Sequence, residues 1–135
     1  MSSENLHVPR EVLSREGRLL HHAITSLKEE LDAVDWYRQR ADDTEDEELK
    51  QVLLHNMREE MEHAAMVLEW IRRNNKEFEG FLKTYLFTDA PIVEVEHAAE
   101  GKETAEEAGR LGGRSGTAAP GSGVDKFTIG SLKGK

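Results

Sequence analysis

Two glutamates and one histidine at helical spacing could together hold a metal ion. Glu60 and His63 lie three residues apart, so an α-helix would present both side chains on one face. Glu30 lies on an earlier segment with the same helical periodicity. The chain has no cysteine, so any metal would be held by carboxylate, imidazole or water, ligands that suit iron, manganese or calcium. Four-helix di-metal bundles use two lone glutamates and two Glu-x-x-His pairs, so this chain supplies one half of such a site.

Two long helices, over residues 9–40 and 46–74, are expected to position these side chains. Pro9 suits the first position of a helix, where its missing N–H costs nothing. Apolar residues then recur at spacings of three, four and seven. The first face comprises Leu13, Leu20, Ile24, Leu27, Leu31 and Val34, and the second stripe comprises Leu49, Leu53, Asn56, Glu60, His63 and Val67. A third, shorter helix is expected over residues 77–87.

An antiparallel hairpin of these helices would bring Glu30 and Glu60 to nearly one level. Glu30 lies about eleven residues before the first helix ends, and Glu60 lies about fourteen residues after the second begins. At about 1.5 Å rise per residue the mismatch is roughly 4.5 Å. Helical side chains lean toward their own N-terminus, which reduces it.

The fold class indicated is all-α: a two-helix antiparallel hairpin plus a short third helix. One hairpin leaves part of its apolar stripe uncovered, and pairing two hairpins into a ferritin-like four-helix bundle would cover it. Two copies of Glu60 buried together would repel each other unless cations lay between them. The alternative is that Glu30 and Glu60 form ion pairs with arginines such as Arg38 or Arg58, and that His63 is a hydrogen-bonded core histidine.

Composition limits the function. Among 135 residues, 27 are acidic and 18 are basic, which gives a net charge of -9 and argues against nucleic-acid binding. No apolar run approaches the roughly 18 residues that a membrane span requires, and no signal sequence is evident, so a cytoplasmic protein is expected. Nine of the eleven glycines follow residue 100. We therefore expect a folded domain over residues 1–97, a flexible Gly-rich linker over 98–123 and a terminal peptide over 124–135.

Acidic clusters flank the expected site. Glu29 and Asp32 are three apart on the first helix, and a second cluster on the next helix consists of His55, Glu59 and Glu62. Either cluster could bind cations in transit, or could simply be a solvated charged face. A second Glu-x-x-His, from Glu94 to His97, follows Pro91 and lacks an apolar stripe, so it is interpreted as a solvated segment.

Four sequence blocks together resemble the encapsulated ferritins. They are EELDAVDWY (29–37), HNMREEMEHAAM (55–66), LEWIRRN (68–74) and TYLFT (84–88), and the resemblance covers about residues 8–96. It implies a half-ferritin that dimerises to complete a di-iron ferroxidase centre, with the dimers forming a ring, a decamer. By position, Glu30, Glu60 and His63 correspond to the iron ligands, with Glu60 as the bridging carboxylate.

The resemblance also implies two peripheral cation sites for calcium or other divalent ions. Glu29 and Asp32 match the family's metal-uptake position, where Asp32 replaces the more usual glutamate. The second site corresponds to His55, Glu59 and Glu62.

The C-terminal segment DKFTIGSLK (125–133) resembles peptides that load cargo into encapsulin shells. Phe127, Ile129 and Leu132 would fill apolar pockets on the inner wall of the shell. The function implied is therefore a ferroxidase in a cytoplasmic encapsulin nanocompartment that stores the iron mineral. The alternatives are a di-metal bundle of the peroxidase or catalase type and a non-enzymatic helical adaptor.

Overall fold

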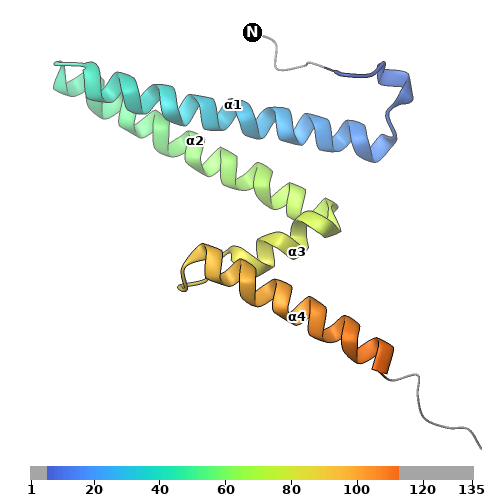
Figure 1. Cartoon of the computed structure of the whole chain (residues 1–135). Coiled ribbons are helices and arrows are strands. Elements are labelled where there is room, and N and C mark those ends of the chain that lie inside the picture. Colours follow the sequence, from blue (N-terminus) through green and yellow to red (C-terminus); the bar gives the residue numbers. More distant parts are fainter. Residues whose placement is uncertain (1–5, 113–135) are drawn as a thin grey trace, which may run out of the picture. The chain divides into compact units, whose positions relative to one another are not determined.

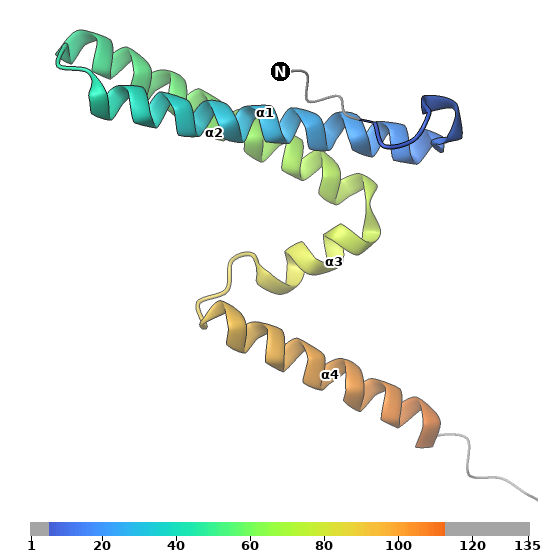
Figure 2. The same ribbon diagram turned by 45° about the horizontal axis from the view of Figure 1, so that its top comes forward.

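A computed structural model describes residues 6–112, and every regular element in that range is helical (Figures 1 and 2). The elements are a short 3-10 helix η1 (Arg10–Val12), α1 (Arg15–Asp43), α2 (Glu47–Asn74), α3 (Lys76–Tyr85) and α4 (Ile92–Gly112). The all-α fold predicted from the sequence is thus confirmed. The chain divides into two compact units, one ending at Ile92 and the other beginning at Val93. No helix within residues 6–112 has the length and apolar character needed to cross a bilayer.

Helices α1 and α2 lie side by side as an antiparallel hairpin in both views (Figures 1 and 2). Helix α1 begins at Arg15 and not at Pro9, because the Ser14 side chain caps it by accepting a hydrogen bond from the Gly17 N–H at 3.0 Å. Asp46 caps α2 by accepting from the Leu49 N–H at 2.7 Å. These two caps set the starting points of the helices that form the site.

A narrow seam holds the hairpin together. In the described part of the chain, the buried apolar side chains are Ala41, Met57, Ala64 and Ile71. The last three are seven residues apart on α2, so they form one row along the helix. Glu60 and His63 are not members of this row and lie beside it.

Large apolar side chains remain exposed on both helices of the hairpin. Examples are Leu31 on α1, which is 54% exposed, and Met66 on α2, which is 63% exposed. A single hairpin therefore covers only part of its apolar surface, which is the state expected of a chain that pairs with another copy. The pairing itself stays a prediction.

Helix α3 is tied to the end of α2 by polar contacts. Asn75 caps α3 by accepting from the Phe78 N–H at 2.8 Å. The Arg72 guanidinium bonds to Glu69 on α2 and to Glu79 on α3, at 2.6 Å and 3.0 Å. These bonds fix the direction in which α3 leaves α2.

Helix α4 extends into the segment for which the sequence predicts a flexible linker. Residues 98–112 are helical to Gly112, so that part of the prediction differs from the structure. Alanine and glutamate dominate this stretch, and their helix propensities outweigh the cost of Gly101 and Gly109. The remaining linker residues, 113–123, and the terminal peptide, 124–135, lie outside the described residues.

Candidate metal centre

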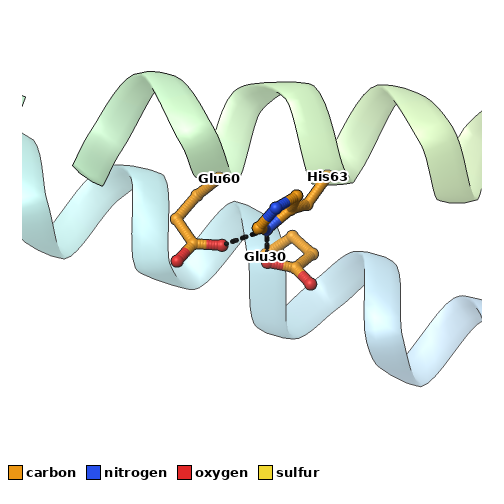
Figure 3. A group of neighbouring side chains, drawn as sticks. All are labelled: Glu30, Glu60 and His63. Carbon is orange, nitrogen blue, oxygen red and sulfur yellow. Dashed lines mark hydrogen bonds and ion pairs between the residues drawn. The ribbon is translucent and has the colours of Figure 1, made fainter. Parts of the chain in front are cut away.

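Three side chains converge between α1 and α2 (Figure 3). Glu30 comes from α1, and Glu60 and His63 come from α2. His63 Nδ1 lies 3.1 Å from Glu60 Oε2 and 3.8 Å from Glu30 Oε2. One ligand atom from each residue lies within 4.8 Å of the other two, and no other group of three histidine, aspartate or glutamate side chains in residues 6–112 meets this criterion.

The centre is covered on one side and open on the other. The Glu60 and Glu30 side chains are 23% and 27% exposed, whereas His63 is 47% exposed. The two carboxylates are thus the more covered part of the centre, and the imidazole is its more accessible part. The site can therefore accept further ligands from solvent or from a second molecule.

The two carboxyl groups interact strongly without a metal. A hydrogen bond to Glu60 raises the pKa of Glu30, and burial and the charge of Glu60 raise it further. The same bond, together with a hydrogen bond from His63, lowers the pKa of Glu60. One proton between the two carboxyl groups thus relieves their repulsion, and a bound cation would do the same with more charge.

Glu60 also acts on the imidazole. Its hydrogen bond is the main cause of the raised pKa of His63, and the charges of Glu60 and Glu30 add to it. A metal ligand must be neutral imidazole, so protons compete with a metal for this site.

Arginines do not neutralise the two glutamates. Arg38 pairs with Asp42 on its own helix at 3.0 Å. Within residues 6–112, the ion-pair partner of both Glu30 and Glu60 is His63. The arrangement therefore differs from the alternative in which Arg38 or Arg58 pairs with these carboxylates.

The donor set fits a divalent metal that prefers oxygen and imidazole ligands. Two carboxylates and one imidazole suit iron or manganese in either of two oxidation states. One chain offers three residues, so it leaves coordination positions open. These positions are where a second set of ligands, or a small oxidant, could bind.

The peripheral residues are not brought together in a single chain. Glu29 and Asp32 are exposed on α1. His55 Nε2 lies 3.8 Å from Glu59 Oε1 on an exposed face of α2, and Glu62 is exposed further along it. Neither cluster forms a three-ligand group, so a cation there would need water or another molecule to complete its shell.

Glu94 and His97 are exposed on α4, in agreement with their interpretation as a solvated segment. The feature that the sequence pattern missed is the buried row of the seam, where Ala64 is central. Its spacing of seven residues was visible in the sequence, but the wider apolar stripe around it hid which row is innermost.

Known proteins match this chain over its helices. A family model described as EncFtn-like matches residues 5–89. An encapsulated ferritin-like protein from Rhodospirillum rubrum is 48% identical over 134 residues, which cover 99% of this chain and 91% of that protein. A ferritin-like protein from Thermotoga maritima is 48% identical over 99 residues, covering 73% of this chain and 87% of the relative.

Two further matches differ in coverage. The encapsulin nanocompartment cargo protein EncC from Myxococcus xanthus is 39% identical over 70 residues, covering 52% of each protein. A crystal structure of protein ne0167 from Nitrosomonas europaea has a TM-score of 0.64 and 54% identity, and it covers 66% of this chain and 98% of its own.

Proposed function

The chain belongs to the EncFtn-like family, and from that premise we propose that it oxidises Fe(II) to Fe(III) with dioxygen at a di-iron site completed by a second copy. The observation that carries the proposal is the convergence of Glu30, Glu60 and His63 within 4.8 Å at the open edge of the hairpin. Three donors from one chain make half of the ligand set that a di-iron helical bundle uses. The second copy would supply the other half.

Each residue has a distinct role in this proposal. Glu60 forms hydrogen bonds with both Glu30 and His63. Because it contacts both of the other ligands, it would be the carboxylate that bridges the two iron ions. Glu30 and His63 would each hold one iron from a single side. Two copies of this set give one imidazole and three carboxylate contacts to each iron, with Glu60 shared.

Uncovered apolar surface supports the pairing. A second hairpin that covers side chains such as Leu31 and Met66 would remove them from water, and this burial would stabilise the pair. It would also bring two acidic centres together, which is favourable only when cations neutralise them. Iron binding and dimerisation should therefore reinforce each other.

The reaction balances with two irons. Two Fe(II) substrate ions supply two electrons, and one dioxygen accepts them with two protons to give hydrogen peroxide; four Fe(II) would give two waters. Paired sites deliver both electrons to one dioxygen molecule, which avoids release of a one-electron product. The ligands would hold the two ions close together, and any proton on Glu30 or His63 would have to leave when iron binds.

Names of the relatives suggest where the activity would operate. One relative is described as encapsulated and another as an encapsulin nanocompartment cargo protein. We extend this to the present chain: residues 124–135 would bind the encapsulin shell, and the folded part would form a decameric ring inside it, in the cytoplasm. Iron would then be stored as mineral within the shell.

The exposed acidic clusters would assist iron uptake. Glu29 and Asp32, and likewise His55, Glu59 and Glu62, would bind calcium or other divalent cations weakly on the way to the centre. Weak binding follows from their exposure, because water competes for the ligands.

Anaerobic loading with Fe(II), followed by exposure to air, tests the ferroxidase proposal. His63→Ala should oxidise iron far more slowly than wild type. His97→Ala is the matched control, because it removes the histidine of the other Glu-x-x-His, which is exposed on α4. Equal rates in wild type and His63→Ala would refute the proposal.

Native mass measurement, with and without Fe(II), tests the shared site. Iron should appear only in species with an even number of chains, and an iron-loaded monomer would contradict the pairing. A peroxidase or catalase would show a different metal and oxygen stoichiometry, and an adaptor would show no oxidation above the buffer background.

A further inference from the structure

We propose that a cavity beside the N-terminal end of α1 binds a small oxyanion, of which inorganic phosphate is the simplest example. Helix η1 and the start of α1 lie at the end of the hairpin away from the α1–α2 connection (Figure 1). Residues of both elements line the cavity. Its lining residues are Leu6, Arg10, Leu13, Arg18, His21 and His22. This inference is independent of the ferroxidase proposal, because it uses none of the same residues.

The charge of this region is opposite to that of the chain as a whole. Residues 6–22 contain three arginines and three histidines against two glutamates. The whole chain has 18 basic and 27 acidic residues. Among residues 6–112, the cavity is lined by cationic, imidazole and apolar groups and by no carboxylate.

Arg18 is positioned by a backbone contact. Its Nε–H donates to the Arg10 carbonyl oxygen at 3.2 Å, which links α1 to η1. Within residues 6–112 neither Arg10 nor Arg18 forms an ion pair, whereas Arg38 and Arg72 both do. Among these described residues, no partner uses the two terminal nitrogens of Arg18, so they can donate to a ligand.

The partial burial of Arg18 favours a negatively charged ligand. Arg18 is half-buried, and covering a cation without a counter-charge is unfavourable. A tetrahedral oxyanion would supply that charge and match the planar fork of a guanidinium with two parallel hydrogen bonds. Arg10, whose backbone carbonyl accepts the hydrogen bond from Arg18, also lines the cavity, and its guanidinium would add a second cation.

The remaining lining adds donors and leaves room for a small ion. The His21 and His22 rings, with centroids 6.0 Å apart, offer further N–H donors, and two leucines complete the lining. The cavity volume of about 140 Å³ is large enough for a phosphate ion. The charge and the donors of the lining, and not its volume, favour an oxyanion.

Calorimetric titration of the full-length, metal-free protein with inorganic phosphate at low ionic strength tests the site. Wild type should bind phosphate saturably, and Arg18→Gln should weaken binding at least tenfold. Arg110→Gln is the matched control, because it removes the same charge from an exposed arginine on α4. Arg18→Lys keeps the charge but loses the planar guanidinium fork, so it should bind phosphate more tightly than Arg18→Gln and more weakly than Arg110→Gln.

Two further measurements keep the test decisive. Arg10→Gln should also weaken binding, and because the Arg10 side chain forms no hydrogen bond or ion pair within residues 6–112, this change should leave the fold intact. Phosphate should shift the NMR signals of His21 and His22. Co-sedimentation with phosphatidic acid vesicles tests whether the phosphate of a lipid headgroup, and not the free ion, is the ligand. Binding to either ligand supports the site only if Arg18→Gln weakens that binding at least tenfold.

The proposal is overturned if wild type shows no saturable phosphate binding at millimolar concentrations. It is also overturned if Arg18→Gln and Arg110→Gln weaken binding equally, since net charge alone would then account for the effect. Neither outcome would bear on Fe(II) oxidation, which His63→Ala tests separately.

Discussion

Replacing Glu60 with glutamine should abolish most Fe(II) oxidation while leaving the fold intact. Glutamine has nearly the same shape, and its amide oxygen can still accept the bond that His63 Nδ1 makes at 3.1 Å. The substitution removes the negative charge of Glu60. A paired site would contain two copies of Glu60, each bridging both irons, so it would lose two negative charges. Groups one step removed from a metal typically contribute about 10–100-fold, so losing a direct, shared ligand should cost on the order of 100-fold in rate.

The assay is stopped-flow absorbance of anaerobic, Fe(II)-loaded protein mixed with aerated buffer. Glu48→Gln is the matched control, since it removes the same charge from an exposed position in the first turn of α2. The control should retain the wild-type rate. If Glu60→Gln oxidises iron within a few-fold of wild type, Glu60 is not a ligand and the site must lie elsewhere.

The same variant makes a second, metal-free prediction. The hydrogen bond to the Glu60 carboxylate and its negative charge raise the pKa of His63. Glu60→Gln can keep the hydrogen bond but removes the charge, so this pKa should fall, as followed by NMR titration. Because the folded pKa is raised, the pair stabilises the metal-free fold fully below pH 6.5 and loses that effect as pH rises through the folded pKa. Iron binding follows the opposite course, since it needs neutral imidazole and improves over the same rise in pH. An unchanged pKa of His63 would show that the 3.1 Å contact does not persist in solution.

Three further predictions concern the metal-free scaffold, each measured at fixed protein concentration. Ile71→Ala, at a fully buried position of the seam, should lower the free energy of unfolding by about 2–5 kcal/mol in urea denaturation, and a change below about 1 kcal/mol would mean that the seam is misplaced. Ser14→Ala removes the cap of α1 and should cost about 1 kcal/mol, with Ser26→Ala, an exposed position within α1, as the control. Arg72 holds the pKa of Glu69 at about 2, so the stabilisation from this pair is complete above pH 4.5 and is lost as pH falls toward 2. Arg72→Met should therefore flatten the pH dependence of the free energy of unfolding in this range. An unchanged slope would contradict the pairing.

The sequence predicted that Glu30, Glu60 and His63 lie close together, because their closeness depends on regular helix geometry. A spacing of three residues places Glu60 and His63 on one helical face, and an antiparallel hairpin brings Glu30 to their level. These statements need only the rise and period of a helix. The closeness of the three ligand atoms agrees with that expectation, while metal binding itself stays a prediction.

Helix ends were harder to predict because several polar residues compete for each one. Asp43, Thr44 and Asp46 are all good caps, and the structure uses Thr44 to end α1 and Asp46 to begin α2. The choice depends on small differences in backbone geometry that the residue types do not express.

The extent of α4 was missed for a related reason. Residues 98–112 contain three glycines, but eight of these fifteen residues are alanine or glutamate, which are strong helix formers. The composition of the whole region after residue 100 concealed this local difference.

The helical form of α4 changes what a tether would do. Its 21 residues span about 30 Å at about 1.5 Å per residue. A random coil limits only how far apart its ends can move, and it spends much of its time with the ends close together. A helix of this length also sets a lower limit on the distance between its own ends. In a chain anchored by its terminal peptide, α4 would therefore add a fixed length of about 30 Å to the tether, where a coil of the same 21 residues would add a variable one.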